Sequence, residues 1–383
     1  MKLDCQIIAF YLPQFFPIKE NDEWWGKGFT EWTNVAKAKS LYKGHNQPRI
    51  PADLGFYDLR VPEVREEQVK MAKEAGVTAF CYWHYWFGNG KRILERVFNE
   101  VLERGNPDFP FCLGWANHSW YAKTWNKDSK DKLLIEQTYP GIEDAKSHFD
   151  FLIKAFKDDR YIKVNGCPYL FIFDPYTLPQ IYIDLFNKWA IEAGFPGLYL
   201  VANLTAIDSV QEFLDKGYSS VLINRTKKAS YSNIDKTAIS FIDKINAMRK
   251  NYQVIDKLIK FRRWCIEHLT IQKPSIIDFS TYYKKLITAE ERKEHIIPQI
   301  MPQWDHTPRS GVYGLVWENA TPTNFYLHAK DALESVKNKK NPIIVLKSWN
   351  EWGEGNYMEP DSKYGKAYIY ALRKAIDEVN NKK

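Results

Sequence analysis

Short apolar segments recur along the chain, and helical patterns separate most of them. These segments are rich in β-branched and aromatic residues and do not alternate with polar ones, which is typical of strands buried on both faces. They occupy residues 7–12, 77–83, 109–115, 168–173, 198–203, 220–224, 296–301 and 343–347. Helical patterns lie at residues 62–75, 92–104, 143–157, 179–193, 207–216 and 322–337. The alternation of these eight strands with helices predicts an α/β protein with a (β/α)8 barrel.

The alternation is interrupted once, between about residues 225 and 293. This Lys-rich segment has a helical pattern near 241–269, and we interpret it as a helical insertion before the seventh strand. A single barrel domain over residues 1–383 accommodates such an insertion. A doubly wound sheet is the alternative, but it would require a glycine-rich phosphate turn after the first strand, where the chain reads Leu12-Pro13-Gln14-Phe15. We expect two long loops, at residues 13–53 and 311–319.

The last apolar strand runs into a stretch of acidic and aromatic residues. Glu351 and Glu354 are three residues apart, so one helical turn would direct both carboxylates into the same space. The carboxyl ends of parallel barrel strands meet at the face that carries the active site. Two carboxyl groups between aromatic rings are the groups that break a glycosidic bond. An exposed acidic turn is the alternative, but Trp349, Trp352 and Tyr357 would be unusual in a solvated turn.

Aromatic, amide and charged side chains follow other predicted strands or lie in the long first loop. Aromatic rings stack on the apolar faces of pyranose rings, and amide or carboxylate groups bind sugar hydroxyls. We expect a carbohydrate substrate to contact Tyr11, Gln14, Trp24, Trp32, His84, Trp86, Trp115, Asn117, Trp120, Asn203, Trp304, Asp305, Trp349 and Asn350. Any one of them could instead be a core residue, and their clustering at strand ends favours a binding site.

Composition narrows the classes of function. Apolar residues make up 45% and charged residues 26% of the chain, as in soluble globular proteins, and 14 tryptophans are compatible with a sugar-binding surface. The net charge of +7 comes from a diffuse Lys excess, so we expect no nucleic-acid partner. The histidines are isolated, and no zinc, phosphate-loop or nucleophilic-serine motif is present. We therefore expect no metal and no cofactor.

The cysteines bear on the cellular compartment. Cys5, Cys81, Cys112, Cys167 and Cys265 are widely spaced and form no Cys-x-x-Cys motif, which predicts reduced thiols in the cytoplasm. The N-terminal apolar run is too short for a signal peptide, and no apolar stretch is long enough to span a membrane. The sequence leaves the oligomeric state open.

Several long motifs carry a resemblance to a known family. They are residues 9–15 (AFYLPQF), 21–35 (NDEWWGKGFTEWTNV), 47–58 (QPRIPADLGFYD), 82–87 (YWHYWF), 301–305 (MPQWD) and 349–360 (WNEWGEGNYMEP). Through them the chain resembles, over nearly its whole length, the WbsX-like proteins of bacterial surface-polysaccharide gene clusters. These are relatives of glycoside hydrolase family 99, the endo-α-mannosidases, to which the likeness rests mainly on Asn-Glu-Trp-x-Glu-Gly.

The resemblance implies a (β/α)8 barrel that cleaves an α-mannosidic bond with retention and without a metal. It implies that Glu351 deprotonates the sugar 2-hydroxyl, which attacks the anomeric carbon to give a 1,2-anhydro intermediate, and that Glu354 protonates the leaving oxygen. The substrate would be a bacterial surface polysaccharide or its precursor. The chain departs from its relatives after the third strand, where Asn117-His118-Ser119-Trp120 replaces an expected Asn-Glu-Asn-Trp. The missing carboxylate concerns the sugar specificity.

Two other classes of function stay open. One is a glycosyltransferase or transglycosidase in O-antigen, lipopolysaccharide or capsule biosynthesis, and the other is a non-catalytic glycan-binding barrel. A transferase that uses a nucleotide sugar usually carries an Asp-x-Asp metal site, which Asp158-Asp159-Arg160 does not form. A binding barrel would not need both glutamates. The sugar, the linkage and endo or exo action are open as well.

Overall fold

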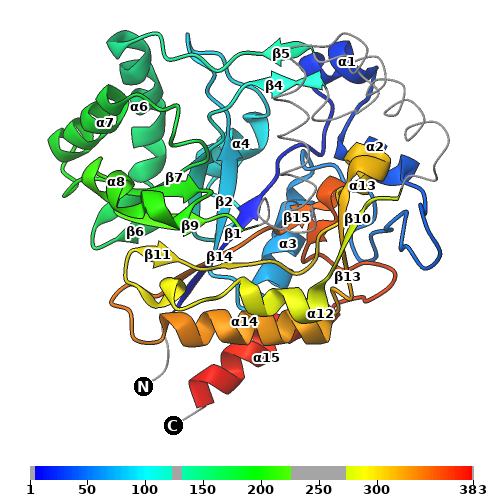
Figure 1. Ribbon diagram of the computed structural model, residues 1–383. Coiled ribbons are helices and arrows are strands. Elements are labelled where there is room, and N and C mark those ends of the chain that lie inside the picture. The colour runs from blue at the N-terminus through cyan, green and yellow to red at the C-terminus, as the bar shows by residue number, and fades with distance from the viewer. Residues whose placement is uncertain (1–4, 123–131, 226–272, 382–383) are drawn as a thin grey trace, which may run out of the picture.

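A parallel sheet, curved into a nearly closed barrel, forms the centre of the molecule (Figure 1). The computed structural model describes residues 5–122, 132–225 and 273–381. Neighbouring strands of the barrel pair in parallel, as predicted. In sheet order they are β11 (Ile296–Ile297), β9 (Ser220–Ile223), β8 (Tyr199–Leu204), β7 (Cys167–Ile172), β3 (Phe111–Trp115), β2 (Ala79–His84), β1 (Gln6–Tyr11), β14 (Ile343–Leu346) and β12 (Gln299–Ile300).

The predicted seventh strand is divided in two by Pro298. Its first half, β11, pairs with β9, and its second half, β12, pairs with β14. Proline has no N–H group to donate to a neighbouring strand. Its carbonyl still accepts a hydrogen bond from the backbone N–H of Val345, at 3.0 Å. The two halves together bring the sheet round from β9 to β14.

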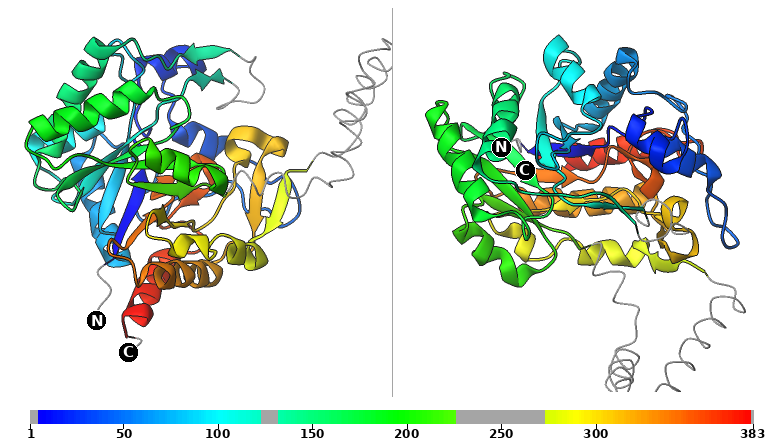
Figure 2. Two further views of the ribbon diagram at one scale, coloured as in Figure 1. Left: turned by 60° about the vertical axis from the view of Figure 1, so that its left-hand side comes forward. Right: turned by 90° about the horizontal axis from the view of Figure 1, so that it is seen from above.

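Helices lie outside the strands (Figure 2). The six predicted helices are present as α3 (Pro62–Ala75), α4 (Arg96–Arg104), α6 (Ile142–Phe156), α7 (Gln180–Glu192), η1 (Ile207–Ser209) with α8 (Val210–Asp215), and α14 (Pro322–Val336). The sequence pattern sets the ends of α3, which begins at a proline in its first turn and ends at Gly76 with a left-handed φ of 88°. An additional helix, α15 (Ala367–Asn381), packs against α14 and α3 (Figure 1).

Aromatic side chains fill the barrel interior. Phe10 of β1 stacks on Trp83 of β2 with ring centroids 4.6 Å apart, and it meets Phe171 of β7 edge-on at 4.8 Å. Ile8 and Val345 are fully buried in neighbouring strands. The interior is therefore a packed core. Trp83 lies at the end of this core where the strands end, and it also lines a cavity there.

The two segments expected to be long loops contain regular structure. The first loop contains α1 (Lys19–Trp25) and α2 (Glu31–Lys37). The second contains η5 (Gly311–Tyr313) and β13 (Leu315–Glu318), which pairs in parallel with β10 (Ser275–Asp278) in a separate small sheet. The prediction of loops was wrong at these positions, because elements of three to seven residues are too short to show a clear period.

The described part of the predicted insertion packs on the barrel. Its elements after β10 are α12 (Phe279–Tyr282), η3 (Tyr283–Lys285) and η4 (Glu290–Arg292). Phe279 stacks on Trp317 of β13, with ring centroids 4.9 Å apart, in a second apolar cluster that also includes Trp304. The helical pattern predicted near residues 241–269 lies outside the described residues, and the single-domain organisation stays a prediction.

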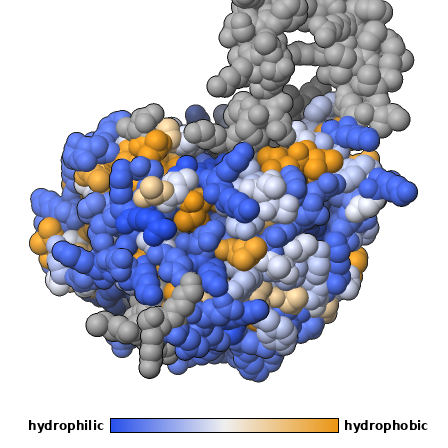
Figure 3. Space-filling model, turned by 60° about the horizontal axis from the view of Figure 1, so that its bottom comes forward, coloured by the Kyte–Doolittle hydropathy of each residue, from blue (hydrophilic) through white to orange (hydrophobic). Residues whose placement is uncertain are grey.

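The short elements at the two ends of the barrel complete the fold. They are β4 (Trp120–Tyr121) with β5 (Leu133–Ile135), β6 (Lys163–Val164), α13 (Thr307–Ser310), β15 (Asn350–Glu351) with β16 (Asn356–Tyr357), and η6 (Trp352–Glu354). One surface of the molecule is largely hydrophilic with separated apolar patches (Figure 3). None of the helices in the described segments is long and apolar enough to cross a bilayer. Cys5, Cys81, Cys112 and Cys167 form no disulfide bond with one another, and Cys265 lies outside the described residues.

Candidate active site

A cavity of about 180 Å³ opens at the carboxyl ends of the barrel strands. Its walls come from the end of β2, from the segments that follow β1, β2, β3, β7 and β14, and from α13. The residues that line it are Leu12, Trp83, Tyr85, Ala116, His118, Trp120, Phe173, Arg309, Lys347, Glu351 and Glu354. Two carboxyl groups, two cationic side chains and a largely aromatic wall thus meet at the face where barrel enzymes carry their sites.

The two glutamates lie on a turn that begins four residues after the end of β14. Glu351 ends β15, and the 3-10 turn η6 carries the chain from Trp352 to Glu354, so the predicted single turn is present. Gly355 follows in the left-handed region, with φ of 55°. A Cβ atom there would lie 2.7 Å from Cβ of Asp305, because the backbone N–H of Asp305 donates to the Glu354 carbonyl at 2.8 Å. Both carboxyl groups reach the cavity.

Arg309 of α13 lies between the glutamates and the first loop. Its Nη1 is 2.7 Å from Oε1 of Glu354 and 3.8 Å from Oε1 of Glu351. Its Nε is 3.0 Å from Oε1 of Glu31, a fully buried carboxylate at the start of α2. One guanidinium therefore contacts three carboxyl groups from opposite ends of the chain.

The environments of the two glutamates differ in their positive charge. Burial, followed by the charge of Glu354, raises the pKa of Glu351 to about 7. Burial also acts to raise the pKa of Glu354, but Arg309, Lys347 and His306 outweigh it, and the pKa is lowered overall. Lys347 Nζ lies 4.0 Å and His306 Nε2 lies 3.7 Å from the Glu354 carboxylate. The ligand-free pair thus keeps Glu354 ionised and the proton on Glu351.

This distribution of the proton differs from the one that the resemblance implies, in which Glu354 is the acid. Glu351 accepts a hydrogen bond from the Ser348 hydroxyl at 2.9 Å, and the carboxyl groups of Glu351 and Glu354 lie close enough to affect each other's pKa. The pair is therefore suited to hold one proton between two carboxyl groups, and the proton can pass from one to the other. Such a pair can act as acid and base at the same pH.

Most of the predicted substrate-binding residues lie outside the cavity lining. Trp120 does line the cavity, and the ring of Trp24 lies 6.1 Å from it, centroid to centroid. The others are largely or fully buried behind the cavity wall: Tyr11, Gln14, Trp32, His84, Trp86, Trp115, Asn117, Asn203, Trp304, Asp305, Trp349 and Asn350. They are not among the residues that line this cavity, and they pack inside the protein, so their role in substrate binding stays a prediction.

One group of these residues supports the glutamate turn from below. The Asn350 side chain binds both backbone groups of Leu12, at 2.8 and 3.0 Å. Trp32 packs on Trp352 with ring centroids 5.4 Å apart. Trp349 has no exposed surface. These contacts fix the turn that carries Glu351 and Glu354.

Gln14 and Tyr11 connect the first strand to its neighbours. The Gln14 carbonyl accepts a hydrogen bond from the backbone N–H of Glu31, at 3.0 Å. The Tyr11 hydroxyl donates to Gln68 of α3, at 2.6 Å. Both side chains are buried, and neither is among the residues that line the cavity.

Asp305 and Trp304 support the other side of the turn. The Asp305 carboxylate accepts hydrogen bonds from the Gln47 amide at 2.7 Å and the Thr307 hydroxyl at 2.6 Å, and it contacts His45 at 2.9 Å. Although burial acts to raise the pKa of Asp305, these partners and the Arg49 charge lower it to about 2. Trp304 lies beneath Lys347, whose Nζ is 4.6 Å from the ring centroid.

The remaining residues face the outer helices or tie strand ends together. His84 contacts His148 of α6, with Nε2 atoms 2.9 Å apart. Trp86 donates to Asp144 of the same helix, at 3.2 Å. The Trp115 indole N–H donates to the Trp86 carbonyl at 3.0 Å.

Asn117 and Asn203 link the ends of neighbouring strands. The Asn117 amide donates to the Asp174 carbonyl at 2.7 Å and accepts from its N–H at 2.8 Å. The Asn203 amide donates to the Phe173 carbonyl at 2.9 Å. Both amides thus satisfy backbone groups beside the cavity.

The lining residues that the sequence analysis missed follow a simple rule. Successive strand residues point to opposite faces, so Trp83 and Tyr85 face inward where His84 and Trp86 face outward. His118 lines the cavity while Asn117 does not, one residue away. Trp83 packs in the barrel interior against Phe10 and Phe171, which are aromatic residues of other predicted strands. This shared aromatic character was the signal that could have shown which residues of the second strand point inward. No sequence pattern indicated Arg309, because it lies in α13, a helix of only four residues.

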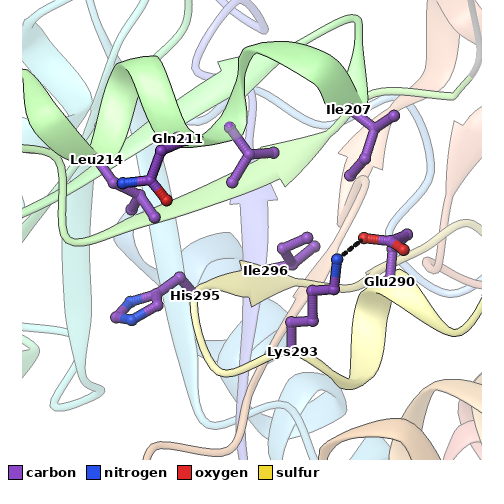
Figure 4. Close-up of a pocket in the computed structure, with 8 residues that line it drawn as sticks. Ile207, Gln211, Leu214, Glu290, Lys293, His295 and Ile296 are labelled. Carbon is purple, nitrogen blue, oxygen red and sulfur yellow. Dashed lines mark ion pairs between the residues drawn. The ribbon is translucent and has the colours of Figure 1, made fainter.

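Two further observations concern other possible sites. A larger cavity of about 540 Å³ lies between α8 and the segment before β11 (Figure 4), where Lys293 pairs with Glu290. Among the described side chains that line it, Glu290 is the one carboxyl group, whereas two carboxyl groups line the glutamate cavity. Within residues 5–122, 132–225 and 273–381, no group of three His, Cys, Asp or Glu side chains is placed to hold a metal ion.

Solved structures of other proteins share this fold. The endo-α-mannosidase of glycoside hydrolase family 99 from Bacteroides thetaiotaomicron is 15% identical, covers 98% of both chains and gives a TM-score of 0.51. A structure described as a glycoside hydrolase-like protein is 14% identical, covers 97% of this chain and 94% of the other, and gives a TM-score of 0.55. These likenesses show a (β/α)8 barrel of the glycoside hydrolase type, and at this identity they show the fold alone.

The sequence comparison identifies the family. The family model described as "Glycosyltransferase WbsX" matches residues 7–372, so the chain belongs to the WbsX family. Two curated relatives from strains of Xanthomonas campestris pv. campestris, both named "Uncharacterized protein WxcX", are 31% identical over 380 residues. The match covers 98% of this chain and 50% of each relative, so the chain spans about half the length of these relatives.

Proposed function

We propose that this protein is a retaining glycoside hydrolase that cleaves an α-linked, mannoside-like bond in a bacterial surface polysaccharide or its precursor. The observation that carries the proposal is the pair Glu351 and Glu354, which share one cavity wall and have opposite pKa shifts. One carboxyl group that is ionised and one that is protonated at the same pH are what glycoside cleavage requires. The substrate class is that of the structural neighbour from Bacteroides thetaiotaomicron, which is an endo-α-mannosidase.

The proposed reaction uses the sugar 2-hydroxyl as the nucleophile. Glu351 takes the 2-hydroxyl proton, O2 forms a bond to the anomeric carbon, and the bond from that carbon to the leaving oxygen breaks. Glu354 gives its proton to the leaving oxygen. Water then opens the 1,2-anhydro sugar with the two roles reversed. Because the ligand-free pair holds its proton on Glu351, this order requires the proton to pass to Glu354 through the contact between them when substrate binds.

The cavity wall provides the other properties that this reaction needs. Trp83, Tyr85, Trp120 and Phe173 offer apolar faces for a sugar ring and exclude water from the carboxyl groups. An environment with little water strengthens the electrostatic effect of each charge on the reacting atoms. His118 lies in this wall at the position where the resemblance leads us to expect a glutamate, so it is placed to change the preferred sugar.

A panel of α-linked oligosaccharides, with and without sugar nucleotides, tests the proposal. We expect hydrolysis without any nucleotide, and no hydrolysis by a Glu351→Gln, Glu354→Gln double variant. The alternative is a glycosyltransferase, which the name of the WbsX family favours. Product formation that depends on a sugar nucleotide would replace our proposal with that alternative. Binding without turnover by the wild type would indicate a glycan-binding barrel.

We further propose a cytoplasmic location, as the cysteine pattern predicts. The support is that the four cysteines in the described residues form no disulfide bond with one another. Thiol titration of protein purified without reductant and then denatured should find five free thiols. A disulfide in that sample would contradict a reducing compartment.

A further inference from the structure

Arg309 connects the first loop of the chain to the glutamate pair. We propose that Arg309, held in place by Glu31, is a positioning residue that sets the charge and direction of Glu354. The inference rests on the proposed function of the glutamate pair, and it adds two residues to which the sequence motifs assign no role.

The distances single out Glu354 as the partner that Arg309 controls. Nη1 of Arg309 is 2.7 Å from Oε1 of Glu354, which is hydrogen-bond distance, and 3.8 Å from Oε1 of Glu351. The side chain of Arg309 is only 5% exposed, so solvent screens this contact weakly. A charge-assisted hydrogen bond in such a setting both favours the ionised carboxylate and fixes its orientation.

Glu31 anchors the guanidinium from the opposite side. Two nitrogens of Arg309, Nε and Nη2, lie 3.0 and 2.9 Å from a single oxygen of Glu31. Glu31 has no exposed surface and is not one of the residues that line the cavity. Glu31 therefore does not reach a substrate in the cavity, and it can act there only through Arg309. A buried carboxylate without a cationic partner is strongly unfavourable, so Glu31 also holds Arg309 in place.

The glutamate turn is shaped to admit this anchor. A Cβ atom at Gly353, the residue before Glu354, would lie 1.5 Å from Oε1 of Glu31 and 3.1 Å from Nε of Arg309. The Glu31 carboxylate therefore packs directly against the backbone of the turn. Asp305 joins α13, which carries Arg309, to the same turn, since its carboxylate accepts a hydrogen bond from the Thr307 hydroxyl at 2.6 Å and its backbone N–H donates to the Glu354 carbonyl.

The expected effect of removing Arg309 follows from the charges that remain. Glu354 would keep Lys347 at 4.0 Å and His306 at 3.7 Å, but would lose its shortest cationic contact. An opposite charge at such a distance typically lowers the pKa of a carboxyl group by about 1–3 units. Loss of Arg309 should therefore raise the pH at which Glu354 ionises by about 1–3 units.

The experiment compares Arg309→Gln and Arg309→Lys with the wild type. The pH at which Glu354 ionises is measured by NMR of ¹³C-carboxyl-labelled glutamate, assigned with a Glu354→Gln variant, so this readout does not depend on turnover. Rates of hydrolysis are measured over the same pH range. Arg65→Gln is the matched control, because Arg65 is also buried and pairs with a carboxylate, Glu100, at 3.1 Å on the outer helices.

We expect Arg309→Gln to shift the ionisation of Glu354 to higher pH and to displace the pH profile in the same direction. It should lower kcat because Glu354 loses the 2.7 Å contact that orients its carboxyl group, although the higher pKa favours the protonated acid. Arg309→Lys should restore the ionisation and only part of kcat, because an ammonium group cannot hold two carboxylates in one plane. Arg65→Gln should leave both unchanged. Unchanged ionisation in Arg309→Gln, or an equal shift in the Arg65 control, would overturn the inference. If the wild type shows no hydrolysis, the proposed function fails, and the titration still decides whether Arg309 controls Glu354.

Discussion

Replacing Gly353 by alanine should force Glu31 away from the glutamate turn. The added Cβ would lie 1.5 Å from Oε1 and 2.7 Å from Cδ of Glu31, far closer than van der Waals contact. Glu31 is fully buried, so it can move only by disturbing Arg309 or α2. Overpacking a core costs about 1–3 kcal/mol, and breaking a buried ion pair costs about 3–5 kcal/mol. We expect Gly353→Ala to lower the free energy of unfolding by roughly 2–5 kcal/mol, between these two cases.

A double-mutant cycle isolates the cause of this loss. Urea unfolding is measured for the wild type, Gly353→Ala, Glu31→Ala and the double variant. Shortening Glu31 removes the atoms that the new methyl group would meet, so Gly353→Ala should cost less than about 1 kcal/mol in that background, a coupling typical of residues in contact. Gly353 has no positive φ, so the backbone itself should tolerate alanine. Equal costs in the two backgrounds would refute the reasoning, because the clash with Glu31 would then not be the cause.

The other predictions concern catalysis and pH. Glu354→Gln should lower hydrolysis of natural substrates by roughly 10²–10⁴-fold but affect a glycosyl fluoride much less, whereas Glu351→Gln should impair both; rescue of Glu351→Gln alone would assign the acid role to Glu351. A 2-deoxy substrate should not turn over, and normal hydrolysis of it would exclude attack by the 2-hydroxyl. Burial raises the pKa of Glu359 from 4.5 to about 7, so the stability it contributes is full below about pH 4.5 and is lost as the pH rises through about 7. That shift of about 2.5 units corresponds to about 3 kcal/mol, and urea unfolding should show a pH dependence over this window that Glu359→Gln lacks; parallel curves for the two proteins would contradict it. His118→Glu should raise kcat/KM for α-mannosides relative to other α-glycosides, and an unchanged ratio would remove His118 from sugar selection.

The barrel could be predicted because burial on both faces leaves a plain mark in the sequence. The run Ile343 to Leu346 has no polar residue, and β14 lies between two neighbours in the sheet. The proximity of Glu351 and Glu354 could be predicted for a similar reason. The two residues are three apart in the sequence, and a single helical turn brings them to one side of the chain. Both signals are local, and local patterns are what a single sequence carries most clearly.

The rest of the site depends on information that is not local. Which of Trp83 and His84 faces the cavity is set by the register of β2 against β1 and β3, and a slip of one residue would exchange them. Tryptophan and histidine both occur in cores and in binding sites, so residue type alone does not show which of the two faces the cavity. The contact between Glu31 and Arg309 joins positions 278 residues apart, so no spacing in the sequence indicates it.

The position of β1 between β2 and β14 has a consequence for how the protein is made. Leu12 is bound by Asn350, 338 residues later in the chain, so the cavity closes only when nearly the whole chain is available. Contacts over such separations form slowly because long loops must close first. A chain still lacking β14 would leave one edge of β1 unpaired, with the apolar run Ile7 to Leu12 open to other strands. Chains truncated before residue 343 should therefore aggregate rather than accumulate as inactive barrels.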